Sequence, residues 1–133
     1  GAGNGQIIIY SALNYGINSF GIEINENLII EAKEKIKLIK KEKKFKKRLF
    51  RKIKLIQEDF FNISLENYNF IYIFSLPTMQ KYLKHVLKTA NPGAIVISFK
   101  YSLIDFEEIL KLSHKLELKD VQQDINTYYY VKL

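Results

Sequence analysis

The stretch that decides the fold is Gly1-Ala2-Gly3-Asn4-Gly5, which Glu23 follows about 20 positions later. Glycines let a backbone come close to a ligand, and the first N–H groups of a helix have no partner within that helix. An acidic side chain at this spacing can accept hydrogen bonds from the two hydroxyls of a ribose. The pattern therefore predicts that a nucleotide-type ligand binds at the start of a helix.

The position of this loop is unusual. In a parallel α/β unit such a loop follows a β-strand, but Gly1 is the first residue of the sequence. We therefore expect residues 1–133 to form a single domain that lacks its N-terminal strand.

Length and composition exclude several classes of protein. The 133 residues are 47% hydrophobic and 26% charged, which is typical of one globular domain with a core. The absence of cysteine excludes disulfides and thiol chemistry, and the two histidines are too few to suggest a metal site. No apolar run reaches the roughly 18 residues of a membrane span. We expect a cytoplasmic, monomeric protein with no membrane partner.

The net charge of +7 is concentrated in one stretch. Of the 21 Lys and Arg residues, 10 lie between Lys40 and Lys54. This stretch is interpreted either as the solvated end of a helix or as a basic surface for RNA or an acidic protein.

Hydrophobic periodicity predicts helices that alternate with strands, and hence a mostly parallel sheet with helices on both faces. Gly16 is expected to end the first helix, and Asn25 and Thr78 are expected to cap later helices. Helices are predicted over residues 6–16, from 26 towards 50, over 78–87 and over 105–114. Strands are predicted over residues 19–24, 52–57 near a sheet edge, 70–74, 94–99, 116–121 and 127–133, the last two as an antiparallel hairpin.

The position of the third glycine distinguishes two kinds of nucleotide-binding loop. A dinucleotide loop reads G-x-G-x-x-G, whereas the sixth position here is Gln6 and the third glycine comes one residue earlier. With this G-x-G-x-G spacing and the features downstream, the chain resembles a class I methyltransferase that uses S-adenosylmethionine (SAM). The resemblance implies a Rossmann-like sheet in the order 3-2-1-4-5-7-6 with strand 7 antiparallel, and Pro92-Gly93 matches the turn into its fifth strand.

The resemblance also implies a cofactor site. Glu23 would hold the ribose hydroxyls, and Asp59 would contact the adenine amino group with Phe60 beside the ring; Glu58 is the alternative to Asp59. The cofactor-binding residues implied in this way are Gly1, Ala2, Gly3, Asn4, Gly5, Glu23, Ile24, Asp59, Phe60 and Ser75.

A narrower resemblance concerns the methyl acceptor. The segments Gly-x-Gly-x-Ile-Ile-Ile, Gly-Ile-Glu-Ile-Asn and Glu-Asp-Phe-Phe resemble those of small archaeal protein-lysine methyltransferases and their mitochondrial relatives. Ser75-Leu76-Pro77-Thr78 stands where methyltransferases of base or glutamine amines carry Asp/Asn-Pro-Pro-Tyr/Phe. The resemblance implies transfer to protein lysine side chains; the alternatives are an RNA methyltransferase that uses Lys40–Lys54 and a non-catalytic binding module.

Aromatic residues near the ends of two central strands are the candidate acceptor channel, because ligands of open α/β sheets bind at these ends. Core packing is the other interpretation of Phe74 and Phe99, and no general base is evident. The candidate channel residues are Tyr72, Phe74, Ser75, Leu76, Pro77, Phe99 and Tyr101.

Overall fold

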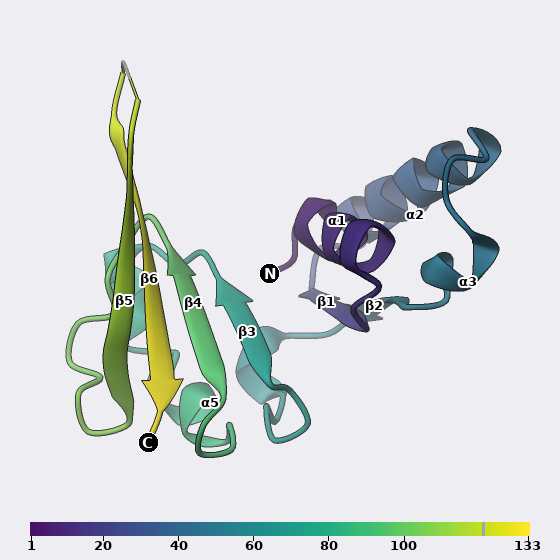
Figure 1. Ribbon diagram of the computed structural model, residues 1–133. Coiled ribbons are helices and arrows are strands. Elements are labelled where there is room, and N and C mark those ends of the chain that lie inside the picture. Colours follow the sequence, from purple (N-terminus) through teal and green to yellow (C-terminus); the bar gives the residue numbers. More distant parts are fainter. Residues whose placement is uncertain (121) are drawn as a thin grey trace. The chain divides into compact units, whose positions relative to one another are not determined.

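The computed structural model describes residues 1–120 and 122–133, which form two compact units, Gly1–Phe60 and Phe61–Leu133. Both units combine strands with helices, so the structure is α/β (Figure 1). In chain order the elements are α1 (Gln6–Tyr15), β1 (Ser19–Glu23), α2 (Glu26–Lys41), α3 (Lys47–Phe50), β2 (Ile53–Gln57), the 3₁₀-helix η1 (Phe60–Asn62), β3 (Phe70–Ile73), α4 (Pro77–Gln80), α5 (Lys84–Lys88), β4 (Ile95–Phe99), β5 (Leu110–Lys119) and β6 (Asp124–Lys132).

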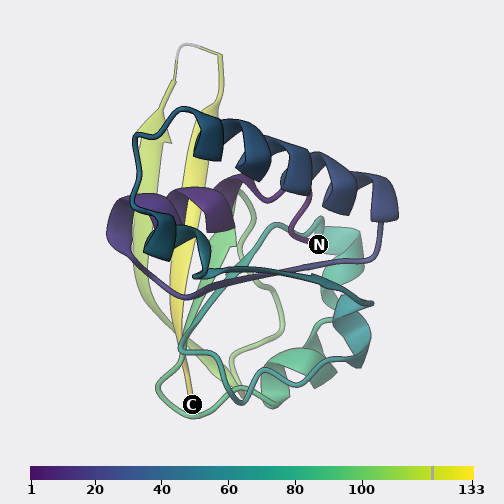
Figure 2. The same ribbon diagram turned by 90° about the vertical axis from the view of Figure 1, so that its right-hand side faces the viewer.

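The first unit is a two-stranded parallel sheet with helices over one face. β1 pairs with β2 from Ser19↔Ile53 to Glu23↔Gln57. Both α1 and α2 lie on the same side of these strands (Figures 1 and 2). Ile9, Leu13 and Phe50 form the buried cluster on which this packing depends.

Local sequence sets the ends of the first two helices as predicted. Gly5 begins α1 with φ +77°, and Gly16 ends it with φ +66°; both angles lie in the left-handed region that favours glycine. The side chain of Asn25 accepts a hydrogen bond from the Asn27 N–H and so caps α2.

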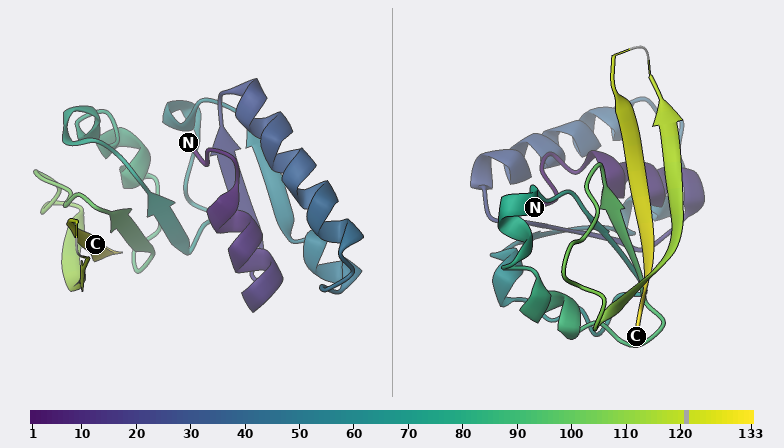
Figure 3. Two further views of the ribbon diagram at one scale, coloured as in Figure 1. Left: turned by 90° about the horizontal axis from the view of Figure 1, so that it is seen from above. Right: turned by 90° about the vertical axis from the view of Figure 1, so that its left-hand side faces the viewer.

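The second unit contains a four-stranded mixed sheet in the order β3-β4-β6-β5. β3 and β4 are parallel, and β6 is antiparallel to both of its neighbours. The long β5–β6 hairpin is evident in Figure 1 and in the right panel of Figure 3. α5 lies on one face of this sheet (Figure 1 and the left panel of Figure 3), and the buried side chains of the unit include Ile71, Ile73, Leu83, Val86, Leu87, Val96, Ser98 and Tyr130.

Within each sheet the strand order agrees with the corresponding part of 3-2-1-4-5-7-6. β2 and β1 stand for strands 3 and 2, and β3-β4-β6-β5 stand for 4-5-7-6, with the antiparallel strand where it was predicted. The order that would join the two sheets stays a prediction.

The helix predicted over residues 105–114 is wrong. The chain from Leu110 onwards is strand β5, which begins six residues before the predicted start at Leu116. Leucines at 110, 112, 116 and 118 alternate with polar residues, a period of two that is typical of a strand. Phe106, Ile109 and Leu110 also recur at helical spacing, which favoured the helix. A bulge between Leu112 and His114 shifts the pairing register within the strand. Val121, the predicted end of this strand, lies outside the described residues.

Two other helices differ from prediction. The segment 78–87 is broken into α4 and α5, and Leu76 with Pro77 begins α4, so Thr78 is not its cap. The helix expected to run from Glu26 towards Arg51 ends at Lys41, and α3 follows after a turn. Lys43 in that turn has φ +54°, which a continuous helix cannot contain.

Candidate functional site

The glycine loop starts beside β1 and leads into α1. The Ala2 N–H donates to the Ile22 carbonyl at 2.7 Å. Successive residues of a strand present their backbone groups to opposite edges of that strand. The carbonyl of Glu23, the next residue, accepts a hydrogen bond from the Glu58 N–H on the β2 side. The loop therefore leaves from the edge of β1 that faces away from β2.

Glu23 is the centre of the site in the first unit. The residue is 7% exposed, and its carboxylate accepts hydrogen bonds from the Gly3 N–H to Oε2 (2.8 Å) and from the Asn25 N–H to Oε1 (3.0 Å). Burial opposes ionisation, but the N–H groups of Asn25 and Gly3 outweigh it and lower the pKa of Glu23. A carboxylate can accept about four hydrogen bonds. The Glu23 carboxylate can therefore accept further hydrogen bonds besides those from the Gly3 and Asn25 N–H groups.

The loop glycines leave the room that a cofactor needs. A Cβ at Gly1 would stand 2.1 Å from Glu23 Oε2, so a side chain there would displace the carboxylate. A Cβ at Gly3 would meet no atom within 4 Å, and its φ is +60°. The loop thus combines an open side with a fixed, ionised acceptor, which fits a ligand that carries a ribose hydroxyl pair.

Gly21 has a structural role that sequence reasoning missed. A Cβ at Gly21 would lie 2.6 Å from Ile8 Cδ1 and 3.0 Å from the Ala2 Cβ. The absence of this atom lets α1 and the loop lie directly on β1. The signal available in the sequence was a glycine inside a strand, which often marks a close backbone approach.

Asp59 and Phe60 follow the neighbouring strand at the same edge of the sheet. Gln57 is paired with Glu23, and Asp59 comes two residues later. Both Asp59 and Phe60 are half-buried, whereas Ile24, directly after Glu23, is 64% exposed. The carboxyl ends of β1 and β2 therefore carry three acids, since the exposed Glu58 precedes Asp59, and two apolar side chains. Ligands of parallel α/β sheets bind at such ends.

The predicted acceptor residues lie in the second unit, at the carboxyl ends of β3 and β4. The ring centroids of Phe74 and Phe99 are 6.0 Å apart, those of Phe74 and Tyr101 are 6.1 Å apart, and those of Tyr72 and Phe99 are 6.4 Å apart. Burial raises the pKa of the Tyr72 hydroxyl. The buried Ser98 hydroxyl donates to the Tyr101 carbonyl at 2.6 Å and fixes the turn after β4. The name aromatic cluster is used below for Tyr72, Phe74, Phe99 and Tyr101.

The loop after β3 supplies the remaining predicted residues. The Ser75 hydroxyl donates to the Leu76 carbonyl at 3.3 Å, Leu76 is 51% exposed, and Pro77 opens α4. Ser75 lies in the second unit, whereas the other predicted cofactor residues lie in the first.

Neither a membrane-spanning helix nor a metal-ligand cluster is present among the described residues. Residues 1–120 and 122–133 contain no helix long and apolar enough to cross a membrane. The same residues contain no group of three or more His, Asp or Glu side chains that could hold a metal ion.

Comparison with protein families identifies a match over most of the chain. The family described as the ANTKMT methyltransferase domain matches residues 1–109. Comparison with curated protein sequences gives no match.

Solved structures share the fold at low sequence identity. An RNA methyltransferase from Salinibacter ruber in complex with S-adenosyl-L-homocysteine is 20% identical, with a TM-score of 0.78 over 98% of this chain and 76% of that one. A magnesium protoporphyrin IX methyltransferase from Synechocystis with bound SAM is 12% identical, with a TM-score of 0.73 over 100% and 67%. An rRNA methylase from Streptococcus thermophilus is 11% identical, with a TM-score of 0.65 over 100% and 83%. These likenesses show that the fold is that of Rossmann-like methyltransferases.

Proposed function

Because the chain belongs to the ANTKMT methyltransferase domain family, we propose that it transfers a methyl group from SAM to the amines of protein lysine side chains. The observation that carries the choice of lysine is the aromatic cluster at the carboxyl ends of β3 and β4.

SAM is proposed as the cofactor on the geometry of the first unit. Glu23 is ionised and fixed by the loop, so it can accept hydrogen bonds from both ribose hydroxyls. Ile24 and Phe60 offer apolar contact for an adenine ring, and Asp59 offers an acceptor for its amino group. Two of the similar structures named above contain S-adenosyl-L-homocysteine or SAM, which supports this assignment.

The acceptor must be a neutral amine. A lysine with its ordinary pKa of about 10.4 costs about 4–5 kcal/mol to deprotonate at neutral pH. Apolar surroundings reduce this cost because they destabilise the charged form. The rings of the aromatic cluster offer apolar surfaces to the neutral amine. Their attraction for a cation can gather the ammonium form, but it opposes the loss of the proton. One ring already has a cation beside it, since Lys100 Nζ lies 5.6 Å from the centroid of Tyr101.

The protein's contribution to the reaction is positioning and desolvation. Bound SAM supplies a methyl group that is activated on a sulfonium. Glu23 and the glycine loop would hold the cofactor, and the nitrogen of a neutral lysine would receive its methyl group. The rings of the aromatic cluster would orient that amine.

Transfer of labelled methyl groups tests the proposal. The protein is incubated with methyl-labelled SAM and a cell extract, and the product is divided between ribonuclease and protease treatment. The proposal predicts label that survives ribonuclease, is released by protease and is recovered as methyl-lysine after hydrolysis. Label that is recovered only in RNA would overturn it.

A further inference from the structure

A basic pocket in the first unit takes no part in the proposed methyl transfer. It has a volume of about 820 Å³ and lies where α2 ends, α3 follows and β2 begins. None of its residues belongs to the predicted cofactor set. The basic pocket is lined by Lys40, Lys43, Phe45, Lys47, Phe50 and Arg51.

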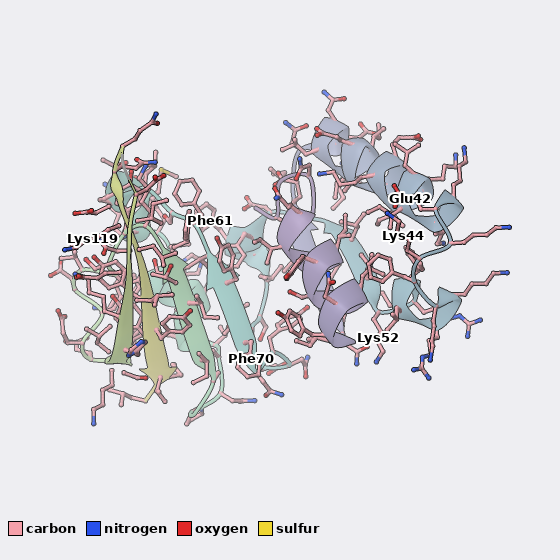
Figure 4. All side chains as sticks on the ribbon, turned by 45° about the horizontal axis from the view of Figure 1, so that its top comes forward. Glu42, Lys44, Lys52, Phe61, Phe70 and Lys119 are labelled. Carbon is pink, nitrogen blue, oxygen red and sulfur yellow. The ribbon has the colours of Figure 1, made fainter. Side chains whose placement is uncertain are left out.

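Positive charge dominates this surface. Four of the lining side chains are cationic and none is acidic. Between Lys40 and Lys54, the one acid among 10 Lys and Arg residues is Glu42. Glu42 pairs with Lys44 at 3.6 Å outside the pocket lining, and Figure 4 shows these two side chains together in the turn after α2. The charge of the pocket itself is therefore not neutralised by the acid nearest to it in sequence.

The floor of the pocket is held by the core of the unit. Phe50 is 8% exposed and clusters with Ile9 and Leu13, and Phe45 packs against that cluster. Lys40 Nζ lies 5.4 Å from the centroid of the Phe50 ring. The cationic side chains on the rim, by contrast, are exposed; they are Lys40, Lys43, Lys47 and Arg51. The pocket therefore presents solvated charges above a buried apolar base.

The composition of the surface favours one kind of partner. Interfaces between proteins are depleted in lysine and rely on exposed apolar anchors, whereas nucleic-acid interfaces are strongly positive. Binding to a membrane surface also needs apolar side chains that can insert. Among the described residues, no exposed large hydrophobic side chain lies between positions 40 and 54.

We propose that the basic pocket binds single-stranded nucleic acid through its phosphate groups. The proposal does not rest on the proposed lysine methylation, and either could fail without the other. Four phosphate contacts, one for each lining cation, predict that affinity falls about 50-fold between roughly 50 and 200 mM salt, from a slope of about −0.7 for each contact on a single strand.

Fluorescence anisotropy with a labelled single-stranded RNA of about 16 nucleotides tests the proposal on the whole protein. The triple variant Lys43→Gln, Lys47→Gln and Arg51→Gln should bind at least ten times more weakly and should lose most of the salt dependence. The control triple variant Lys33→Gln, Lys88→Gln and Lys111→Gln removes the same charge from exposed positions elsewhere and should change affinity less than threefold.

Thermal unfolding of both triple variants by circular dichroism separates lost binding from lost folding, and all six substituted side chains are exposed. Equal weakening in the two folded variants would overturn the proposal, as would binding that salt does not affect. Tighter binding of a polyglutamate peptide or of phosphatidylserine vesicles at the same salt concentration would overturn the assignment to nucleic acid.

Discussion

At the scale of single residues, Glu23 connects the loop, the strand and the proposed cofactor. Its carboxylate fixes the loop through Gly3 and the start of α2 through Asn25. The sequence predicted this residue because an acid at the end of a strand, about 20 positions after a glycine loop, has a chemical reason to be there. The hydrogen bond to Gly3 could not be predicted, since it depends on how the loop folds back.

The state of Glu23 makes stability depend on pH. Its pKa is lower in the folded than in the unfolded chain, so the carboxylate adds stability that is fully present above the unfolded pKa of about 4.3. This stability is lost as pH falls through the lower, folded pKa. Glu23→Gln removes it, so the difference in unfolding free energy between wild type and variant should narrow between about pH 6 and pH 3. Urea denaturation across that range measures the difference, and a constant gap would contradict the assignment.

The aromatic cluster gives a second prediction at this scale. Phe74→Ala should lower kcat/KM for a lysine acceptor about tenfold or more. The substitution removes a ring whose contact with the amine is expected to contribute ~1–2 kcal/mol of binding free energy. Phe70→Ala is the matched control: Phe70 is 70% exposed, more than Phe74 at 56%, and it lies at the opposite end of β3 (Figure 4). Equal losses in the two variants, with SAM binding intact, would exclude the cluster as the acceptor channel.

At the scale of elements, agreement with the sequence follows the strength of local signals. The ends of α1 were predicted from the glycine at each end, and the start of α2 was predicted from its capping residue Asn25. Strands β3 and β4 were predicted from their apolar runs. The first half of β5 was predicted as a helix because Phe106, Ile109 and Leu110 recur at helical spacing, whereas its second half was predicted as a strand. Segment 78–87 was predicted as one helix because its apolar spacing is the same whether it forms one helix or two.

The packing of α1 on β1 can be tested at Gly21. Gly21→Ala would place a Cβ 2.6 Å from Ile8 Cδ1, which is the end of a side chain that can rotate, and 3.0 Å from the Ala2 Cβ. We therefore expect a loss of about 1 kcal/mol of stability, at the lower end for overpacking. Ile8→Val removes the clashing methyl group, so the loss in the double variant should be smaller than the sum of the two single losses. Free energies of unfolding for the wild type and the three variants measure this coupling. Additive losses would mean that α1 does not approach β1 this closely.

At the scale of the whole molecule, the sequence predicted the class of fold and the order of strands within each sheet. Strands that alternate with helices indicated a mostly parallel sheet, and the strand order came from the resemblance to class I methyltransferases. The division into units Gly1–Phe60 and Phe61–Leu133 was not predicted. Periodicity reports which residues are buried, but not which elements bury them together.

Binding of SAM to the whole protein, measured by isothermal titration calorimetry, tests the central claim most directly. We expect one SAM site per chain, with an affinity that Glu23→Gln lowers tenfold or more, about 1.4 kcal/mol, because the variant loses the ionised acceptor for the ribose hydroxyls. An absence of binding by the folded wild type, or equal affinity in the folded Glu23→Gln variant, would contradict it.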